Sequence, residues 1–151
     1  MSVLKNRRSE SKAEFLNTAN EIYTRTLAFL SRLSARYSRL LAADTIRLAS
    51  EVIDHTEKAN SIFPSSDARK ELREKHLLEA RGALMALDVK LLHCYSVLTQ
   101  NPSGCFETAS GKPLGASDAI AKLDSMAQTL GELVDKENAL LSSLIKSSKH
   151  S

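Results

Sequence analysis

The sequence predicts an all-α protein, an up-down-up-down four-helix bundle in one domain. Its 151 residues suffice for a single hydrophobic core and are too few for two ordinary domains. Only five glycines and three prolines occur, and most of them fall between residues 101 and 116, so the rest of the chain is compatible with helix. Apolar residues recur at steps of three and four in four segments with mostly short connections, a pattern typical of such a bundle.

The first predicted helix covers residues 10–38 and follows a polar, basic stretch, residues 1–9, that we expect to be disordered. Two apolar lines run along this helix at helical spacing, so it has more apolar surface than one neighbouring helix would cover. They are Phe15, Ala19, Ile22, Phe29, Leu33 and Leu40 on one face, and Leu16, Tyr23, Leu30 and Tyr37 on the adjacent face. Residues 42–44 form the predicted connection to the next helix.

The second and third predicted helices, residues 44–63 and 66–100, form an antiparallel pair. Asp44 is the predicted N-cap of the second helix, and Pro64 ends it. Ser66 is the predicted N-cap of the third helix. Because the connection between these helices is so short, they must be neighbours that run in opposite directions.

The third predicted helix carries two apolar seams. Leu77, Ala80, Leu84, Leu87, Leu91, Cys94 and Leu98 form one seam, and Leu78, Met85 and Leu92 form a second one beside it. A surface helix needs only one apolar stripe, so this helix must be covered on more than one side. It is either the central helix of the bundle or a helix shared with a partner subunit, and Leu78, Met85 and Leu92 are the predicted oligomer or partner face.

Residues 101–116 form a long loop before the last predicted helix, residues 117–146. Helix connections in bundles usually have about two to eight residues. The loop forms either a small β-hairpin, turning at Ser110 and Gly111, or an irregular structure. Ser117 is the predicted cap of the last helix, whose apolar seam is interrupted once, at Glu137. We expect the polar tail, residues 147–151, to be frayed.

The positive charge of the chain is concentrated near its N-terminus. The formal net charge is +3, yet residues 1–43 hold eight Lys/Arg against three Glu. The predicted first helix carries Arg25, Arg32, Arg36 and Arg39, spaced to project from one face, with no acid between Ile22 and Ala43. The planar guanidinium suits phosphate, so these arginines are candidate nucleic-acid contacts. The alternative is a solvated face whose arginines pair with acids on neighbouring helices.

A second basic group opens the third predicted helix. Its candidate nucleic-acid contacts are Arg69, Lys70 and Arg73. Glutamates are interleaved with them, so local ion pairs can neutralise much of this group. If the fold brings this helix start near Arg36, the two basic groups would form one patch.

The sequence contains no constellation that supports catalysis, a metal site or a bound cofactor. Phosphate-binding loops and nucleophile motifs are absent. His93, Cys94 and Cys105 lack the paired spacing of a zinc site, and we expect both cysteines to be free thiols. No apolar run reaches the roughly 18 residues of a membrane span. We therefore expect a non-enzymatic, cytoplasmic protein without metal or cofactor.

Helices two and three carry a run of residues that resembles a family of small bacterial four-helix bundles. The run comprises Ala59, Asn60, Ser61, Ile62, Phe63, Pro64, Arg69, Leu72, Arg73, His76, Leu77, Glu79, Ala80, Ala83, Leu84, Ala86 and Leu87. It is similar to the accessory variability determinant (Avd) of diversity-generating retroelements and to proteins encoded in intervening sequences of 23S ribosomal RNA genes. The loop at residues 101–116 is longer than a minimal family member needs.

This resemblance implies a basic, non-enzymatic homo-oligomer, by analogy a pentameric ring. Such a protein would bind structured RNA or DNA and dock onto a reverse transcriptase during retrohoming. A rival interpretation from the residues alone is an oligomeric protein-interaction or structural bundle with no nucleic-acid role. In that case the arginines would serve solubility or salt bridges.

Overall fold

The computed structural model describes residues 2–6 and 13–150, and these residues form an all-α protein, as predicted. The helices are α1 (Val3–Asn6), α2 (Glu14–Leu30), α3 (Ala35–Ser61), α4 (Asp67–Gln100) and α5 (Ala116–His150). The expected disorder of residues 1–9 is replaced at residues 3–6 by the single turn of α1, while the remaining expectations for residues 1 and 7–12 lie outside the described residues.

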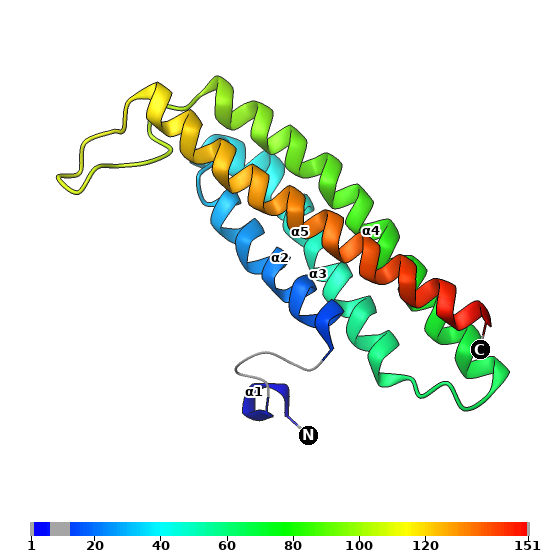
Figure 1. The fold of residues 1–151 in the computed structure, drawn as a ribbon. Coiled ribbons are helices and arrows are strands. Elements are labelled where there is room, and N and C mark those ends of the chain that lie inside the picture. Colours follow the sequence, from blue (N-terminus) through cyan, green and yellow to red (C-terminus); the bar gives the residue numbers. More distant parts are fainter. Residues whose placement is uncertain (1, 7–12, 151) are drawn as a thin grey trace.

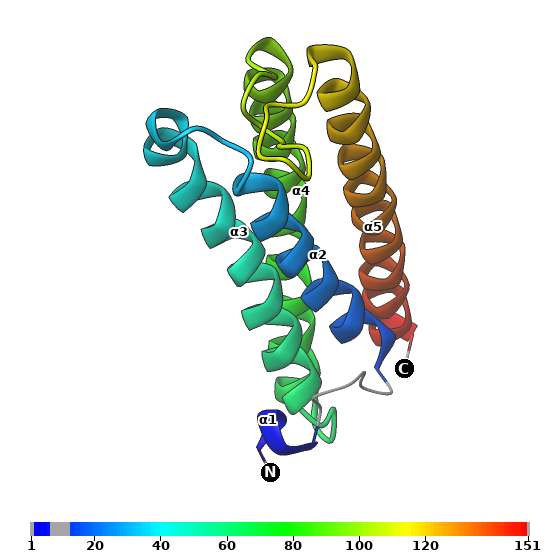
Figure 2. The ribbon, with the colours of Figure 1, turned by 90° about the vertical axis from the view of Figure 1, so that its left-hand side faces the viewer.

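The four long helices lie side by side (Figure 1). α3 packs against α2 and α4, and α5 packs against α4 and α2, so each long helix has two neighbours. Residues 31–34 and the loop at residues 101–115 lie at one end of the molecule (Figure 2). Residues 62–66, the start of α2 and the end of α5 lie at the other end. At that end Lys136 of α5 forms an ion pair of 2.8 Å with Glu14 of α2.

The break between the first two long helices lies at residues 31–34, so the predicted boundaries 10–38 and 44–63 are wrong. Ser34 has an extended backbone, and its hydroxyl accepts a hydrogen bond from the Tyr37 N–H at 3.4 Å, which caps α3. The expected connection at residues 42–44 lies inside α3. Ala42 and Ala43 continue the helix, because alanine has the highest helix propensity. Asp44 therefore lies within α3 and does not cap a helix.

The connection between α3 and α4 agrees with the prediction. α3 ends at Ser61, shortly before Pro64, and the Ser66 hydroxyl accepts a hydrogen bond from the Arg69 N–H at 3.2 Å. The predicted helix at residues 66–100 is therefore confirmed as α4. α5 begins at Ala116, so Ser117 is not its cap, and α5 continues through residues 147–150, where fraying was expected.

The core contains the first predicted seam of α4. All seven of its members, from Leu77 to Leu98, are buried. Phe29 and Ile22 of α2, Val52 of α3, and Leu123 and Leu141 of α5 are buried as well. The core also encloses Glu137, so the apparent interruption of the last seam is a buried position on the same face.

The long loop forms a hairpin-like turn, one of the two structures predicted for it. Glu107 and Pro113 form an isolated antiparallel bridge, and the Thr108 N–H donates to the Lys112 carbonyl at 2.7 Å. Gly111 has φ +82°, a conformation that favours glycine at this turn. Before the turn, Cys105 and Phe106 are buried against the helices, so the loop is anchored to the bundle.

Candidate functional site

The four candidate arginines near the N-terminus do not share one helix face. Arg25 lies on α2, Arg32 lies in the connection after α2, and Arg36 and Arg39 lie on α3. The predicted face requires a continuous helix from Arg25 to Arg39, and the break at residues 31–34 interrupts it. The prediction of a single stripe is therefore wrong, and each arginine has its own surroundings.

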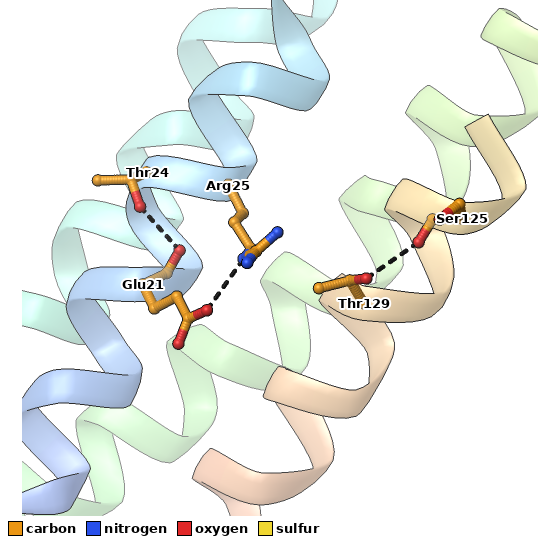
Figure 3. A network of polar contacts seen from close by, with 5 residues as sticks. All are labelled: Glu21, Thr24, Arg25, Ser125 and Thr129. Atoms are coloured by element: carbon orange, nitrogen blue, oxygen red, sulfur yellow. Dashed lines mark hydrogen bonds and ion pairs between the residues drawn. The ribbon is translucent and has the colours of Figure 1, made fainter. Parts of the chain in front are cut away.

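Arg25 is paired with an acid on its own helix. Its Nε donates to Glu21 Oε1 at 3.0 Å, and Figure 3 shows this pair on α2, with Ser125 and Thr129 on the nearby α5. Glu21 lies just before the acid-free stretch that starts at Ile22. At Arg25 the alternative interpretation, a solvated face with local ion pairs, therefore holds.

Arg32 is partly buried beneath the long loop. Its Nη1 donates to the carbonyl oxygen of Cys105 at 3.2 Å, and its guanidinium carbon lies 4.4 Å from the centre of the Phe106 ring. The Lys122 ammonium lies 5.4 Å from the same ring. The Arg32 Nε is buried and has no hydrogen-bond partner among the described residues. Two contacts thus fix this guanidinium while one of its donors stays unused.

Arg36 and Arg39 are exposed in the first turns of α3. The first turn of α3 contains no acidic residue, and neither arginine forms an ion pair with any residue in the described ranges 2–6 and 13–150. Together with Arg32 they make a group of three arginines within eight residues, at the end of the molecule that carries the loop. We call Arg32, Arg36 and Arg39 the basic end.

The second basic group lies at the opposite end of the molecule. Arg69 is exposed, and Lys70 and Arg73 are partly buried, all in the first two turns of α4. α3 separates them from the basic end, and its 27 residues span about 40 Å. The two groups therefore do not form one patch.

The predicted partner face is uncovered. Leu78, Met85 and Leu92 are 47%, 39% and 59% exposed, although all three are large apolar side chains. Val89, 52% exposed, completes the stripe and was missed, although its spacing of four from Met85 and three from Leu92 is a signal in the sequence. We call these four residues the α4 stripe.

The hydropathy of α4 reflects apolar seams on two sides. By length and composition alone α4 is apolar enough to cross a membrane, and among the described residues it is the one helix that meets this test. A third of its most apolar window is buried in the bundle, and the core helix of a soluble protein passes the same test. The α4 stripe accounts for the part that the bundle leaves uncovered.

Within the described part of the chain, no group of three or more His, Cys, Asp and Glu side chains is placed to hold a metal ion. His93 is exposed, whereas Cys94 and Cys105 are free and buried, and burial raises the pKa of both thiols. His55 and His76 lie between α3 and α4 with their Nδ1 atoms 3.0 Å apart. A hydrogen bond in which one Nδ1–H donates to the other Nδ1 accounts for that distance, because a neutral imidazole has one donor and one acceptor.

Glu137 is a buried acid. In the sequence it stands out only as an interruption of an apolar seam, and its burial was not predicted. Its side chain is 0% exposed, and neither carboxyl oxygen has a hydrogen-bond partner among the residues described. Burial raises its pKa to about 8, and the positive charge of Lys136 opposes this shift. The carboxyl is therefore neutral at pH 7, as its apolar surroundings require.

The comparisons with known proteins identify no relative. No family model matches the chain, and no curated protein or solved structure matches it.

Proposed function

We propose that this chain is an up-down-up-down four-helix bundle that acts as a non-enzymatic nucleic-acid-binding accessory protein. The basic end, Arg32, Arg36 and Arg39, carries this proposal, because three arginines gather there without an acidic partner among the described residues. Guanidinium groups that keep their charge and have no acidic partner are suited to phosphate oxygens. The ligand that fits is the backbone of a structured RNA or DNA.

The resemblance of helices two and three to Avd gives this proposal its biological setting. By that resemblance the chain is a cytoplasmic protein that forms a homo-oligomer, a pentamer, and supports a reverse transcriptase in a diversity-generating retroelement. The α4 stripe supports assembly, since subunit contacts would remove its exposed apolar side chains from water. Arg69, Lys70 and Arg73 are secondary contacts, because they lie at the other end of the molecule.

The test is binding of a hairpin RNA by the wild-type protein and by the double variant Arg36→Gln/Arg39→Gln. Both residues are exposed on α3, so their loss leaves the core intact. We expect wild-type affinity to fall steeply between about 50 and 200 mM KCl, with a log–log slope that the double variant reduces by about two. Filter binding across this salt series measures the slope.

The matched control is Arg69→Gln/Arg73→Gln, which removes the same charge from the opposite end. We expect this control to weaken binding less than the variant of the basic end. Equal RNA binding by wild type and Arg36→Gln/Arg39→Gln would refute the proposal.

A second candidate is an oligomeric interaction or structural bundle with no nucleic-acid role. The α4 stripe favours it, because large exposed apolar side chains in a row mark contact surfaces. Met85→Glu/Leu92→Glu should convert an oligomer into a smaller species in light scattering after size exclusion. Leu27→Glu is the control, since Leu27 is exposed on α2 and lies outside the stripe. An unchanged mass in the double variant would rule out assembly through α4.

A further inference from the structure

A pocket of about 380 Å³ opens beside Arg32. The connection from α2 to α3 forms one wall, with Arg32 and Ser34, and the first turn of α3 adds Tyr37. The end of α4 and the start of the loop form the other wall, with Ser103 and Cys105. The pocket therefore lies where two segments far apart in the sequence meet, residues 31–37 and 97–105, and the Phe106 ring and the Cys105 carbonyl fix its arginine.

Arg32 has no acidic partner in this pocket among the residues that the structure describes. Arg32 forms no ion pair with any acid that the structure describes, and its Nε is a buried donor without an acceptor. The Cys105 thiol supplies no negative charge at neutral pH, because burial raises its pKa. A guanidinium keeps its proton at any ordinary pH, so a partly buried arginine is normally matched by an anion. Among the described residues, no acid matches the charge of Arg32.

The rest of the pocket wall suits an anion with several oxygen atoms. Ser34 and Tyr37 place the N-terminus of α3 in this wall; the Ser34 hydroxyl accepts a hydrogen bond from the Tyr37 N–H, and no acid occupies the first turn. Ser34 and Ser103 add hydroxyl groups, and the exposed Arg36 follows four residues after Arg32, in the first turn of α3. The volume accommodates a phosphate with an attached sugar and is far too small for a double helix.

We infer that this pocket binds a single phosphate group, held by the Arg32 guanidinium and the N-terminus of α3. The inference deepens the proposed function, because it assigns one phosphate of the nucleic acid to a defined cavity at the basic end. Two sources share this chemistry: a phosphate of the RNA itself, and a free phosphate monoester such as a mononucleotide.

The experiment uses a variant that keeps the fold and fills the pocket with negative charge. Arg32→Met alone would be ambiguous, because Arg32 also contacts Phe106 and the loop backbone. Ser34→Asp keeps an N-cap residue as effective as serine and places a carboxylate beside Arg32. The matched control, Ser66→Asp, makes the same change at the N-cap of α4, at the opposite end of the molecule.

The probes are inorganic phosphate and AMP, titrated calorimetrically at fixed ionic strength, together with the hairpin RNA. We expect one saturable phosphate site in wild type and in Ser66→Asp, and at least tenfold weaker binding in Ser34→Asp, with no loss of thermal stability in either variant. If the monoester is the natural source, AMP binds more tightly than phosphate. If the RNA supplies the phosphate, RNA binding weakens in Ser34→Asp while AMP gains nothing over phosphate.

Wild type that shows no saturable binding of either probe, or Ser34→Asp that binds phosphate as well as wild type, would overturn the inference. These results are distinct from failure of the proposed function. If the protein binds phosphate in this pocket but binds no RNA, the pocket inference stands and the proposed function fails. If RNA binding depends on Arg36 and Arg39 while Ser34→Asp binds phosphate as well as wild type, the proposed function stands and the pocket inference fails.

Discussion

Arg32 and Glu137 both carry polar atoms without partners among the described residues, and they lie in opposite surroundings. Arg32 lies beside a pocket at the loop-bearing end of the molecule, with part of its side chain in contact with solvent. Glu137 lies within the core and is 0% exposed. One group can attract a counterion from outside, whereas the other cannot.

The difference shows how each ionisable group can tolerate burial. A carboxyl can become neutral by binding a proton, and burial raises the pKa of Glu137 to about 8 for this reason. A guanidinium cannot lose its proton, so Arg32 needs an anion or water. The core can therefore hold Glu137 as an uncharged side chain, while Arg32 lies at the surface of a cavity.

The strongest test of this comparison is Glu137→Gln, studied across pH. Because the pKa of folded Glu137 lies near 8 and its ordinary value is 4.5, the unfolded chain loses this proton first as pH rises. The contribution of Glu137 to stability should therefore be greatest below about pH 4.5 and fall until about pH 8, by on the order of 5 kcal/mol. Urea unfolding at several pH values measures the difference between wild type and Glu137→Gln.

The difference between the two proteins isolates Glu137 from other titrating groups. His76 opposes the trend, because burial and nearby positive charges lower its pKa and its stabilising contribution is lost as pH falls. Glu132→Gln is the control, since Glu132 is exposed on the same helix. A difference between wild type and Glu137→Gln that stays constant from pH 5 to about 8 would contradict the neutral state of the buried carboxyl.

A smaller change in stability is expected at Thr26. It is the third residue with a buried polar atom that has no partner among the described residues, and it carries no charge. Its hydroxyl is buried and has no partner among the described residues, whereas the Thr45 hydroxyl donates to the Leu41 carbonyl at 2.8 Å. Thr26→Val should stabilise the fold by about 1 kcal/mol, and Thr45→Val should destabilise it by about 1 kcal/mol. Thermal unfolding of the two valine variants compares them directly. If both substitutions changed the stability in the same direction, hydrogen bonding would not distinguish the two threonines.

The connection between α3 and α4, with α4 itself, was the most predictable part of the fold. Pro64 and Ser66 act within a few residues of their own positions, so the sequence carries their signals directly. The break after α2 was missed because residues 31–34 contain neither glycine nor proline, and Leu33 stays in register with the apolar residues of α2. α3 begins there at a serine cap whose local signal is weaker than that of a glycine or proline.

The arginines of the candidate site could be named from the sequence, but their arrangement in space could not be predicted from it. Arg32, Arg36 and Arg39 stay near one another because they are close in sequence, whereas Arg25 is paired with Glu21. The contact of Arg32 with Phe106 joins residues 74 positions apart, and no local pattern encodes it. The pocket depends on that contact, so it becomes visible only when the loop is placed against the helices.

The loop at residues 101–115 has a consequence for the chain entropy of folding. It is three times as long as the connection at residues 62–66, yet closing it costs only about 1 kcal/mol more, since the cost grows with the logarithm of loop length. Burying a phenylalanine such as Phe106 contributes about 1.5 to 3 kcal/mol. Burial of this anchor thus exceeds the extra closure cost of the longer loop.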